Sequence, residues 1–262
     1  MKLSTFSAGF LALYLAIGAA TLAAYRAPPL PAVPAKAGDD LVDYGLRLVS
    51  ETFAHIGPNV SDPQRRFAGN NLACQNCHLD AGLKPAGLPL TGTQHNYPKF
   101  STRAGRVISL IDRVNECMTR SMNGHPLPEN SREMAAFLTY MRSIDKGGAV
   151  QEAAAPESPL PPDTTRGAEV FARVCANCHQ PDGLGVRVGA VTEPRGYQFP
   201  PVWGPDSFND GAGMDRFDRA VGFILRNMPR GIDPANPQLS LQEAWDVAAY
   251  LQAQPRPHFV NR

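Results

Sequence analysis

The clearest chemistry in this sequence lies in two five-residue motifs. One reads CQNCH from Cys74 to His78, and the other reads CANCH from Cys175 to His179. Each matches C-x-x-C-H, the signature of covalent attachment of a c-type haem. Two thiols at this spacing can reach the two vinyl groups on one edge of the porphyrin, and the adjacent histidine then lies under the iron. We therefore predict two covalently bound haem c groups, held by Cys74, Cys77, His78, Cys175, Cys178 and His179.

The repetition of the motif favours haem over other uses of paired cysteines. A single match could arise by chance or serve as a redox C-x-x-C. Zinc sites of this type need a second pair of soft ligands nearby, and neither half of the chain offers one. The chain has five cysteines, so one thiol remains once four are assigned to haem. That remaining residue is Cys117.

The sixth ligand of each iron decides what the haem can do, because axial-ligand identity is a main control of reduction potential. In the second half the candidates are Met214 and Met228. Met228 is favoured because it follows His179 by 49 residues and precedes Pro229, an arrangement that resembles the Met-Pro pair of class I cytochromes c. Met214 is more simply explained as a side chain that packs at the haem edge. Ligation by His179 and Met228 would give a comparatively high potential and an electron-transfer role.

In the first half, the fifth cysteine lies where an axial ligand is expected. When the two closing helices are aligned on Tyr140 and Tyr250, the favoured methionine of the second half matches Met118. Cys117 is its immediate neighbour. Met118 and Met122 are the alternatives, and either would make the first haem an ordinary His/Met centre.

A helical projection places Cys117 among arginines. At about 100° per residue, Met118 falls on the apolar stripe of its helix, whereas Cys117 shares a face with Arg106, Arg113, Arg120 and Ser121. Guanidinium groups and a ferric iron each lower the pKa of a thiol, so Cys117 is predicted to be a thiolate, an iron ligand and a nucleophile. The same arginines would bind a small dianion through paired N–H donors. The alternative for each arginine alone is a solvated helix face.

Both halves repeat one plan: a helix leading into the haem motif, a long irregular loop, a second helix and a closing helix. Matching Cys74 with Cys175 gives an offset of 101 residues, and matching Tyr140 with Tyr250 gives 110, so the repeat carries insertions. No sustained period-2 alternation is present, and the long loops are rich in Gly and Pro. We predict a mostly α fold of two class I cytochrome c-like domains, each with one covalent haem, joined by an Ala/Pro-rich linker.

The start and the middle of the chain delimit these domains. Lys2 is followed by an uncharged, Ala/Leu-rich run to Tyr25, which is typical of an export signal and long enough for an N-terminal anchor; a buried core helix is the alternative. We expect a periplasmic protein, attached to the membrane only if this segment stays uncleaved. The predicted divisions are a signal peptide or anchor at 1–25, a Pro-rich tether at 26–38, a first cytochrome c domain at 39–146, a linker at 147–163 and a second cytochrome c domain at 164–262.

Charge and composition exclude other classes of protein. Lysine and arginine number 25 against 24 aspartate and glutamate, which gives a net charge of +1, and no run of five like charges occurs. This balance offers no electrostatic basis for binding nucleic acid. A hydrophobic content of 43% suffices for a folded core and excludes a disordered polymer.

Longer stretches around the motifs carry a family resemblance. They are NLACQNCHLDAG, RVNECMTRSMNG, GYQFPPVWGPDSFNDGAGM, and NMPRG followed by EAWDVAAYL. Together they resemble the dihaem thiosulfate dehydrogenases, which form tetrathionate in bacterial periplasms and are related to the Sox-system cytochrome subunit. The similarity covers residues 39–255, and RVNEC with RSMNG is its most specific element, because C-x-x-C-H alone indicates only a cytochrome c.

The resemblance implies that the first haem is catalytic and the second relays electrons. His78 and Cys117 would ligate the first iron. The thiosulfate pocket beside it would be lined by Arg113, Ser121 and Arg103, with Arg120 on the same helix face as Cys117.

For the second haem, some family members place a lysine just before the methionine as an alternative ligand. Asn227 occupies that position here and cannot replace the methionine, so ligation by His179 and Met228 is expected without a lysine switch. The implied reaction joins two thiosulfate ions into tetrathionate, and the same chemistry permits tetrathionate reduction. Electrons would pass from the first haem to the second and on to a soluble acceptor such as a small cytochrome c.

Cys117 is the expected nucleophile of this reaction, and two other functions are weighed against it. Cys117 would leave the iron, form an S–S adduct with one thiosulfate and be displaced by the second. A non-catalytic dihaem electron carrier would instead use the arginine face to dock an anionic redox partner. A dihaem peroxidase would need a displaceable histidine, but no histidine occupies the aligned distal position among His55, His95, His125 and His258.

Overall fold

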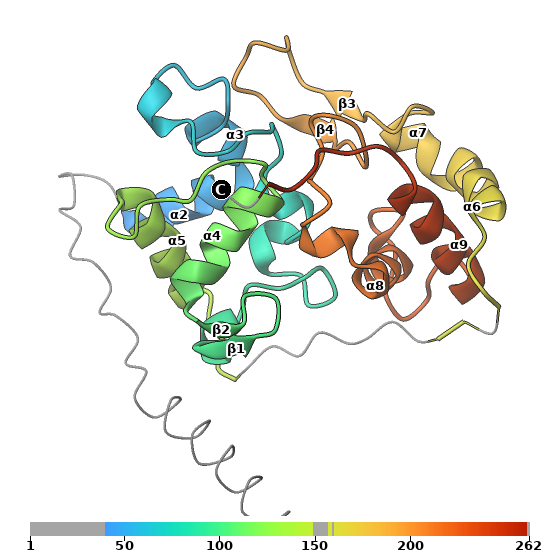
Figure 1. The fold of residues 1–262 in the computed structure, drawn as a ribbon, viewed down its shortest axis with the longest axis horizontal. Coiled ribbons are helices and arrows are strands. Elements are labelled where there is room, and N and C mark those ends of the chain that lie inside the picture. The colour runs from blue at the N-terminus through green and yellow to red at the C-terminus, as the bar shows by residue number, and fades with distance from the viewer. Residues whose placement is uncertain (1–39, 149–156, 159, 261–262) are drawn as a thin grey trace, which may run out of the picture.

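The computed structural model describes residues 40–148, 157–158 and 160–260, so the predicted leader, the tether and part of the linker lie outside the described residues. Two halves lie side by side, one coloured blue to green and the other yellow to red (Figure 1). Helices dominate both halves, and within the described ranges the strands form two small antiparallel sheets. The mostly helical fold that the sequence predicts is confirmed. In the same ranges, each helix is too short or too polar to span a bilayer.

Four α-helices and one two-stranded sheet form the described part of the first half. They are α2 (Leu41–Ser50), α3 (Thr52–His55), β1 (Lys99–Ser101), β2 (Arg106–Ile108), α4 (Leu110–Arg120) and α5 (Arg132–Ser143). Short 3-10 turns lie at Pro63–Arg65, Cys74–Asn76, Asp80–Gly82 and Thr93–Asn96. Polar residues cap the helices: Asp40 accepts the N–H of Val42 at 2.7 Å, and Ser109 with Asp112 forms a reciprocal capping box at the start of α4.

Helices α2 and α5 cross closely because a glycine lies at their contact. A Cβ atom on Gly45 would lie 2.3 Å from the carbonyl oxygen of Ala136 and 2.5 Å from the Cβ of Tyr140. Any other residue would therefore force the helices apart. The core beside this crossing is closely filled, and its most deeply buried members are Leu48, Val49, Ile56, Met118 and Met134.

The second half repeats this crossing. Its elements are α6 (Thr164–Val170), a π-helical turn (Phe171–Cys175), α7 (Ala176–His179), β3 (Val186–Arg187), β4 (Tyr197–Phe199), a 3-10 turn (Gly213–Asp215), α8 (Phe217–Asn227) and α9 (Leu241–Gln252). A Cβ atom on Gly167 in α6 would lie 2.1 Å from the carbonyl oxygen of Asp246 and 2.7 Å from the Cβ of Tyr250 in α9. Tyr250 thus holds the place in α9 that Tyr140 holds in α5, which supports aligning the halves on these tyrosines.

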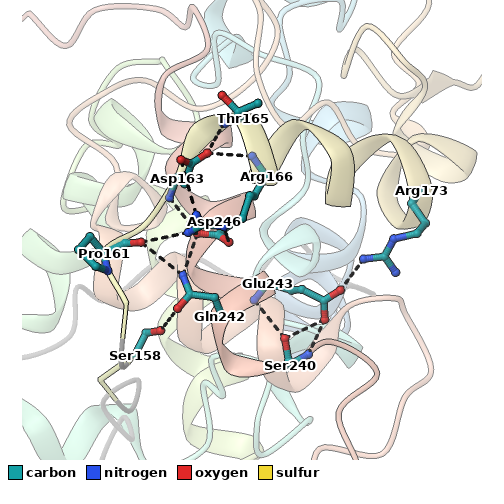
Figure 2. Close-up of polar contacts among 10 residues, drawn as sticks. All are labelled: Ser158, Pro161, Asp163, Thr165, Arg166, Arg173, Ser240, Gln242, Glu243 and Asp246. Atoms are coloured by element: carbon teal, nitrogen blue, oxygen red, sulfur yellow. Dashed lines mark hydrogen bonds and ion pairs between the residues drawn. The ribbon is translucent and has the colours of Figure 1, made fainter.

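A polar network fastens α6 to α9 beside the second crossing (Figure 2). Asp246 is 2% exposed and accepts two hydrogen bonds from Arg166, at 2.7 Å from Nε and 2.9 Å from Nη2. The backbone N–H of Asp163 donates a third at 2.8 Å. Because hydrogen bonds to an ionised group offset its loss of hydration, this buried carboxylate is well satisfied. The network fixes the entry of α6, which leads directly into the second haem motif.

Buried amides join the two halves to each other. Asn70 and Asn123 of the first half both donate to the carbonyl of Ser207, at 3.3 Å and 2.6 Å. Asn209 of the second half donates in return to the carbonyl of Thr119 at 3.0 Å. The C-terminal segment also reaches the first half, where the end of the chain is marked in Figure 1. A loop of the second half is thereby held against the haem-binding face of the first.

We expect Gly45→Ala and Gly167→Ala each to lower the free energy of unfolding by about 3 kcal/mol, because the added methyl group would overlap backbone atoms of the partner helix. Chemical denaturation of the haem-loaded protein measures this. Gly105→Ala is the control: a Cβ at Gly105 meets no atom within 4 Å, so only the strain of its φ of +64° remains, about 1 kcal/mol. Equal losses in all three variants would contradict the role of the crossings.

Candidate functional site

Two adjoining cavities open beside the first haem motif. The smaller has a volume of about 90 Å³ and a mostly apolar wall that includes both motif cysteines, His78, Cys117 and Ser121. The larger has a volume of about 260 Å³, shares His78 and Cys117 with the smaller, and adds polar residues to its wall. These polar residues are Thr93, Asn96, Tyr97, Lys99, Arg113 and Arg219. An apolar slot thus continues into a positively charged chamber, with His78 and Cys117 at the junction.

The histidines of both motifs are oriented in the same way. Nδ1 of His78 lies 2.6 Å from the carbonyl oxygen of Leu88, and Nδ1 of His179 lies 2.7 Å from that of Pro200. Because a carbonyl oxygen can only accept, each Nδ1 donates this hydrogen bond, and each Nε2 lies on the other side of the ring. Burial also lowers the pKa of His179, which favours its neutral form. Nε2 is therefore the nitrogen available to a metal in both motifs.

The residues of the first motif fit a haem. Burial raises the pKa of the Cys74 thiol to about 11 and that of Cys77 to about 12, so both thiols are held neutral against the apolar slot. All cysteines in the described residues are free of disulfides. Two neutral thiols, an oriented imidazole and an apolar wall are the groups that attach and enclose a porphyrin.

The second motif and Met228 meet at one buried cluster. Cys175 and Met228 both pack against apolar residues of the second core, which include Phe171, Trp203 and Val247. Met228 directly follows the last residue of α8, so the helix end places its thioether. The structure thus brings the predicted methionine to the same core as the second haem motif. Its ligation of the iron remains a prediction.

Cys117 is the residue with the most altered chemistry in the site. Burial opposes ionisation of its thiol, but the positive charge of Arg113 and a hydrogen bond with the His78 side chain outweigh burial and lower the pKa of Cys117 to about 7. The negative charge of Cys117 in turn raises the pKa of Arg113. The contact with His78 joins the first haem motif to α4. The two predicted ligands of the first iron therefore lie next to each other.

The predicted substrate residues separate into two groups. Arg113 lies on the wall of the larger cavity, where it bonds Glu116 at 3.3 Å, and Ser121 lies on the wall of the smaller one. Arg103 and Arg120 line neither cavity. Both donate to the carbonyl of Gly211, at 2.8 Å and 3.4 Å, at the contact between the halves. Neither the helix face, which includes Arg120, nor the family resemblance, which suggested Arg103, could show that a loop of the second half would engage these arginines.

Two other charged residues of the chamber were not predicted from the sequence. Lys99 lies in β1, with its Nζ 5.0 Å from the centre of the Tyr97 ring. Arg219 belongs to α8 of the second half but lines the chamber of the first. No sequence signal links α8 to this chamber, because residue spacing within one half carries no information on contacts between halves.

Met214 also belongs to the first half's cavity rather than to the second haem. It lines the smaller cavity together with Phe208, another residue of the second half. The hydrogen bonds of Ser207 and Asn209 hold this loop against the first half. Met214 therefore lies at the cavity of the first haem motif, and Met228 remains the predicted ligand of the second iron.

We expect Met214→Ala to alter the absorption spectrum of the first haem and to leave the near-infrared band of methionine-ligated ferric haem intact. Its side chain contacts the first cavity, so only the surroundings of that haem change. Met228→Ala is the matched variant and should abolish the band. Loss of the band in Met214→Ala would instead make Met214 the ligand.

A family model matches each half of this chain. The family model described as SoxA/TsdA, cytochrome c domain, matches residues 64–150, and that described as cytochrome C oxidase, cbb3-type, subunit III, matches residues 162–251. The thiosulfate dehydrogenase of Stutzerimonas stutzeri (strain A1501) is 35% identical over 240 residues, covering 89% of this chain and 73% of that protein. The thiosulfate dehydrogenase of Allochromatium vinosum is 35% identical over 246 residues, covering 90% of this chain and 86% of that protein.

A solved structure agrees with these similarities. The thiosulfate dehydrogenase (TsdBA) from Marichromatium purpuratum matches with a TM-score of 0.70 and 32% sequence identity. The match covers 91% of this chain but only 51% of that chain, so this chain spans about half the length of the solved protein.

The fold and the two motifs define a dihaem cytochrome c with two covalently bound haem c groups. More narrowly, the chain belongs to the thiosulfate dehydrogenase family, and it is an oxidoreductase. The fold class, the cofactors and the family resemblance predicted from the sequence are confirmed.

Proposed function

We propose that this protein oxidises thiosulfate and joins two thiosulfate ions into tetrathionate. One observation carries the proposal: the Cys117 thiol, with its pKa lowered to about 7, lies where the apolar slot meets a chamber lined by Lys99, Arg113 and Arg219. A nucleophilic sulfur beside a cluster of cations suits a small sulfur dianion. The names of the relatives support this choice of substrate.

The haems would be held by residues of each half. His78 and Cys117 would ligate the first iron, and His179 and Met228 the second. When bound, each haem takes up and passes on single electrons. Because Asn227 replaces the lysine of some family members, the second ligand set would keep its methionine throughout.

The cationic chamber would overcome the repulsion between the two substrates. Each thiosulfate is a dianion, so bringing two sulfur atoms together is opposed by Coulomb repulsion. Arg113 would bind one sulfonate through its N–H groups. Lys99 and Arg219 would make the electrostatic potential of the surrounding chamber positive. The hydroxyl of Ser121, on the wall of the smaller cavity, would donate a hydrogen bond to the substrate. The positions of these donors are set before substrate arrives, which is the requirement for electrostatic catalysis.

Cys117 would carry the covalent step. Its thiolate and the outer sulfur of the first thiosulfate would form an S–S bond, a two-electron oxidation in which the haems held by each half would supply the route for the electrons to the external acceptor. The outer sulfur of a second thiosulfate then attacks the outer sulfur of the adduct, and tetrathionate forms as the Cys117 thiolate departs. No proton is transferred in either step, so atoms and charge balance. Tetrathionate reduction is the same sequence in reverse.

The remaining features concern the protein's surroundings. We propose export to the periplasm through the segment 1–25, with attachment to the membrane only if that segment is retained, and a soluble acceptor such as a small cytochrome c. The domain limits proposed are 39–146 and 164–262, joined by a linker at 147–163 after the tether at 26–38. Because the protein has a net charge of only +1, we propose no nucleic-acid partner.

We expect Cys117→Gly to abolish thiosulfate-dependent reduction of an added cytochrome c while both haems stay attached. The thioether bonds depend on the motif cysteines, so the variant loses the nucleophile and the proposed iron ligand but keeps both haems. Haem content is measured by absorbance of the denatured, reduced protein. Thr119→Ala is the control on the same helix, since its hydroxyl bonds only backbone carbonyls of α4. Full activity of Cys117→Gly would mean that another group is the nucleophile, whereas an inactive wild-type protein would favour a non-catalytic electron carrier.

We expect Arg113→Gln to lower kcat/KM for thiosulfate about 100-fold, the usual effect of removing one preorganised charge-stabilising donor. Steady-state kinetics with an artificial electron acceptor measures this. Arg106→Gln is the matched control: Arg106 lies in β2, just before the same helix, and pairs with Asp112 at 2.8 Å on an exposed surface. Equal effects in both variants would show that general positive charge, and not the chamber, attracts the substrate.

A further inference from the structure

Asn227, the last residue of α8, occupies an unusual position between the two haem sites. It is completely buried, and it directly precedes Met228. Its Nδ2 donates to the carbonyl of Phe223 in the same helix at 3.0 Å. The same Nδ2 also donates to the carbonyl of Ala86 at 2.8 Å. Ala86 belongs to the first half, so one side-chain amide reaches from the second haem's methionine into the first domain.

The turn that receives this hydrogen bond orients the histidine of the first haem motif. Leu88 follows Ala86 by two residues, and its carbonyl accepts from Nδ1 of His78 at 2.6 Å. Leu88 has a φ of +50°, a left-handed conformation that costs a leucine about 1–2 kcal/mol. The adjoining Gly87 is held by hydrogen bonds to Lys84 and Leu79. A strained turn of this kind persists only when its surroundings hold it, and Asn227 supplies one support from the other half.

Stability alone does not account for this amide. Its Oδ1 is buried and has no hydrogen-bond partner among the described residues. A buried acceptor left unpaired costs about 1–3 kcal/mol, which offsets the gain from the two bonds that Nδ2 makes. A leucine has nearly the same shape, would leave no unpaired oxygen, and would suit a merely structural position in this core.

We propose that Asn227 is a positioning residue that connects the axial ligands of the two haem sites. Its side chain supports the Ala86–Leu88 turn, which orients His78. Its backbone fixes the start of the segment that contains Met228. The inference rests on the ligand sets of the proposed function. It does not depend on which substrate is oxidised.

The expected consequence is a linked change at both irons. A hydrogen bond from Nδ1 makes a histidine a more basic ligand, and such outer contacts tune the reduction potential of the metal. Without the brace, the Leu88 carbonyl would hold Nδ1 of His78 less firmly, so the potential of the first haem should rise. The same change frees the backbone before Met228, so the band of the methionine-ligated haem should weaken or shift.

The test uses the haem-loaded protein and two leucine variants. In Asn227→Leu, an optical redox titration should show a higher potential of the first haem together with a changed methionine band of the second. Asn59→Leu is the matched control, because Asn59 also spans the halves and donates to the carbonyls of Val191 and Glu193, at 2.8 Å and 3.2 Å. It should leave both potentials and the band at their wild-type values. The free energy of unfolding should change little in Asn227→Leu.

Other results would overturn the proposal. A change confined to the methionine band would make Asn227 a local neighbour of Met228, and unchanged potentials would remove its role at both irons. Equal shifts in Asn59→Leu would mean that the contact between the halves matters generally. If Asn227→Leu does not retain both haems, Asn227→Ser is titrated instead, and it must show the same linked shift. The titration contains no thiosulfate, so a wild-type protein inactive with thiosulfate would refute the proposed function without affecting this result.

Discussion

The structure depends on the orientation of two imidazoles. In each, Nδ1 is hydrogen-bonded to the backbone, and Nε2 is left to bind a metal. In both halves a backbone carbonyl accepts a hydrogen bond from Nδ1. The carbonyl belongs to Leu88 for His78 and to Pro200 for His179. Each acceptor lies in an irregular loop, so the loops must hold their carbonyl oxygens in place. The close helix crossings at Gly45 and Gly167 pack the helices of each half, around which these loops run.

The first haem site is completed by the second half of the chain. Phe208 and Met214 close its apolar cavity, and Arg219 adds a charge to its chamber. Buried amides that bond backbone carbonyls across the contact hold these residues in place, and a polar group buried in this way costs stability unless it is paired. Residues of both halves therefore line the cavities beside the first haem motif.

Local charge, and not the charge of the whole chain, suits this site to an anion. The sequence has a net charge of only +1, yet Lys99, Arg113 and Arg219 line one chamber. Two opposing effects act on Cys117: burial favours the thiol, and the neighbouring guanidinium of Arg113 favours the thiolate. The combined effect of Arg113 and His78 on the pKa is larger than that of burial, because these groups approach Cys117 within a low-dielectric cavity, where Coulomb attraction is stronger than in water. The result is a buried thiol that ionises more readily than an ordinary cysteine.

The sequence by itself determined the features that depend on near neighbours in the chain. The C-x-x-C-H spacing indicated both haems, the helical period separated Cys117 from the buried Met118, and the repeat predicted two similar helical halves. Contacts between the halves were decided only by the tertiary structure. It placed Arg103 and Arg120 at the contact between the halves, assigned Met214 to the first cavity and brought Arg219 into the anion chamber. The physical reason is that periodicity and motif spacing describe one element at a time, whereas a cavity wall is assembled from loops whose relative positions depend on packing of the whole chain.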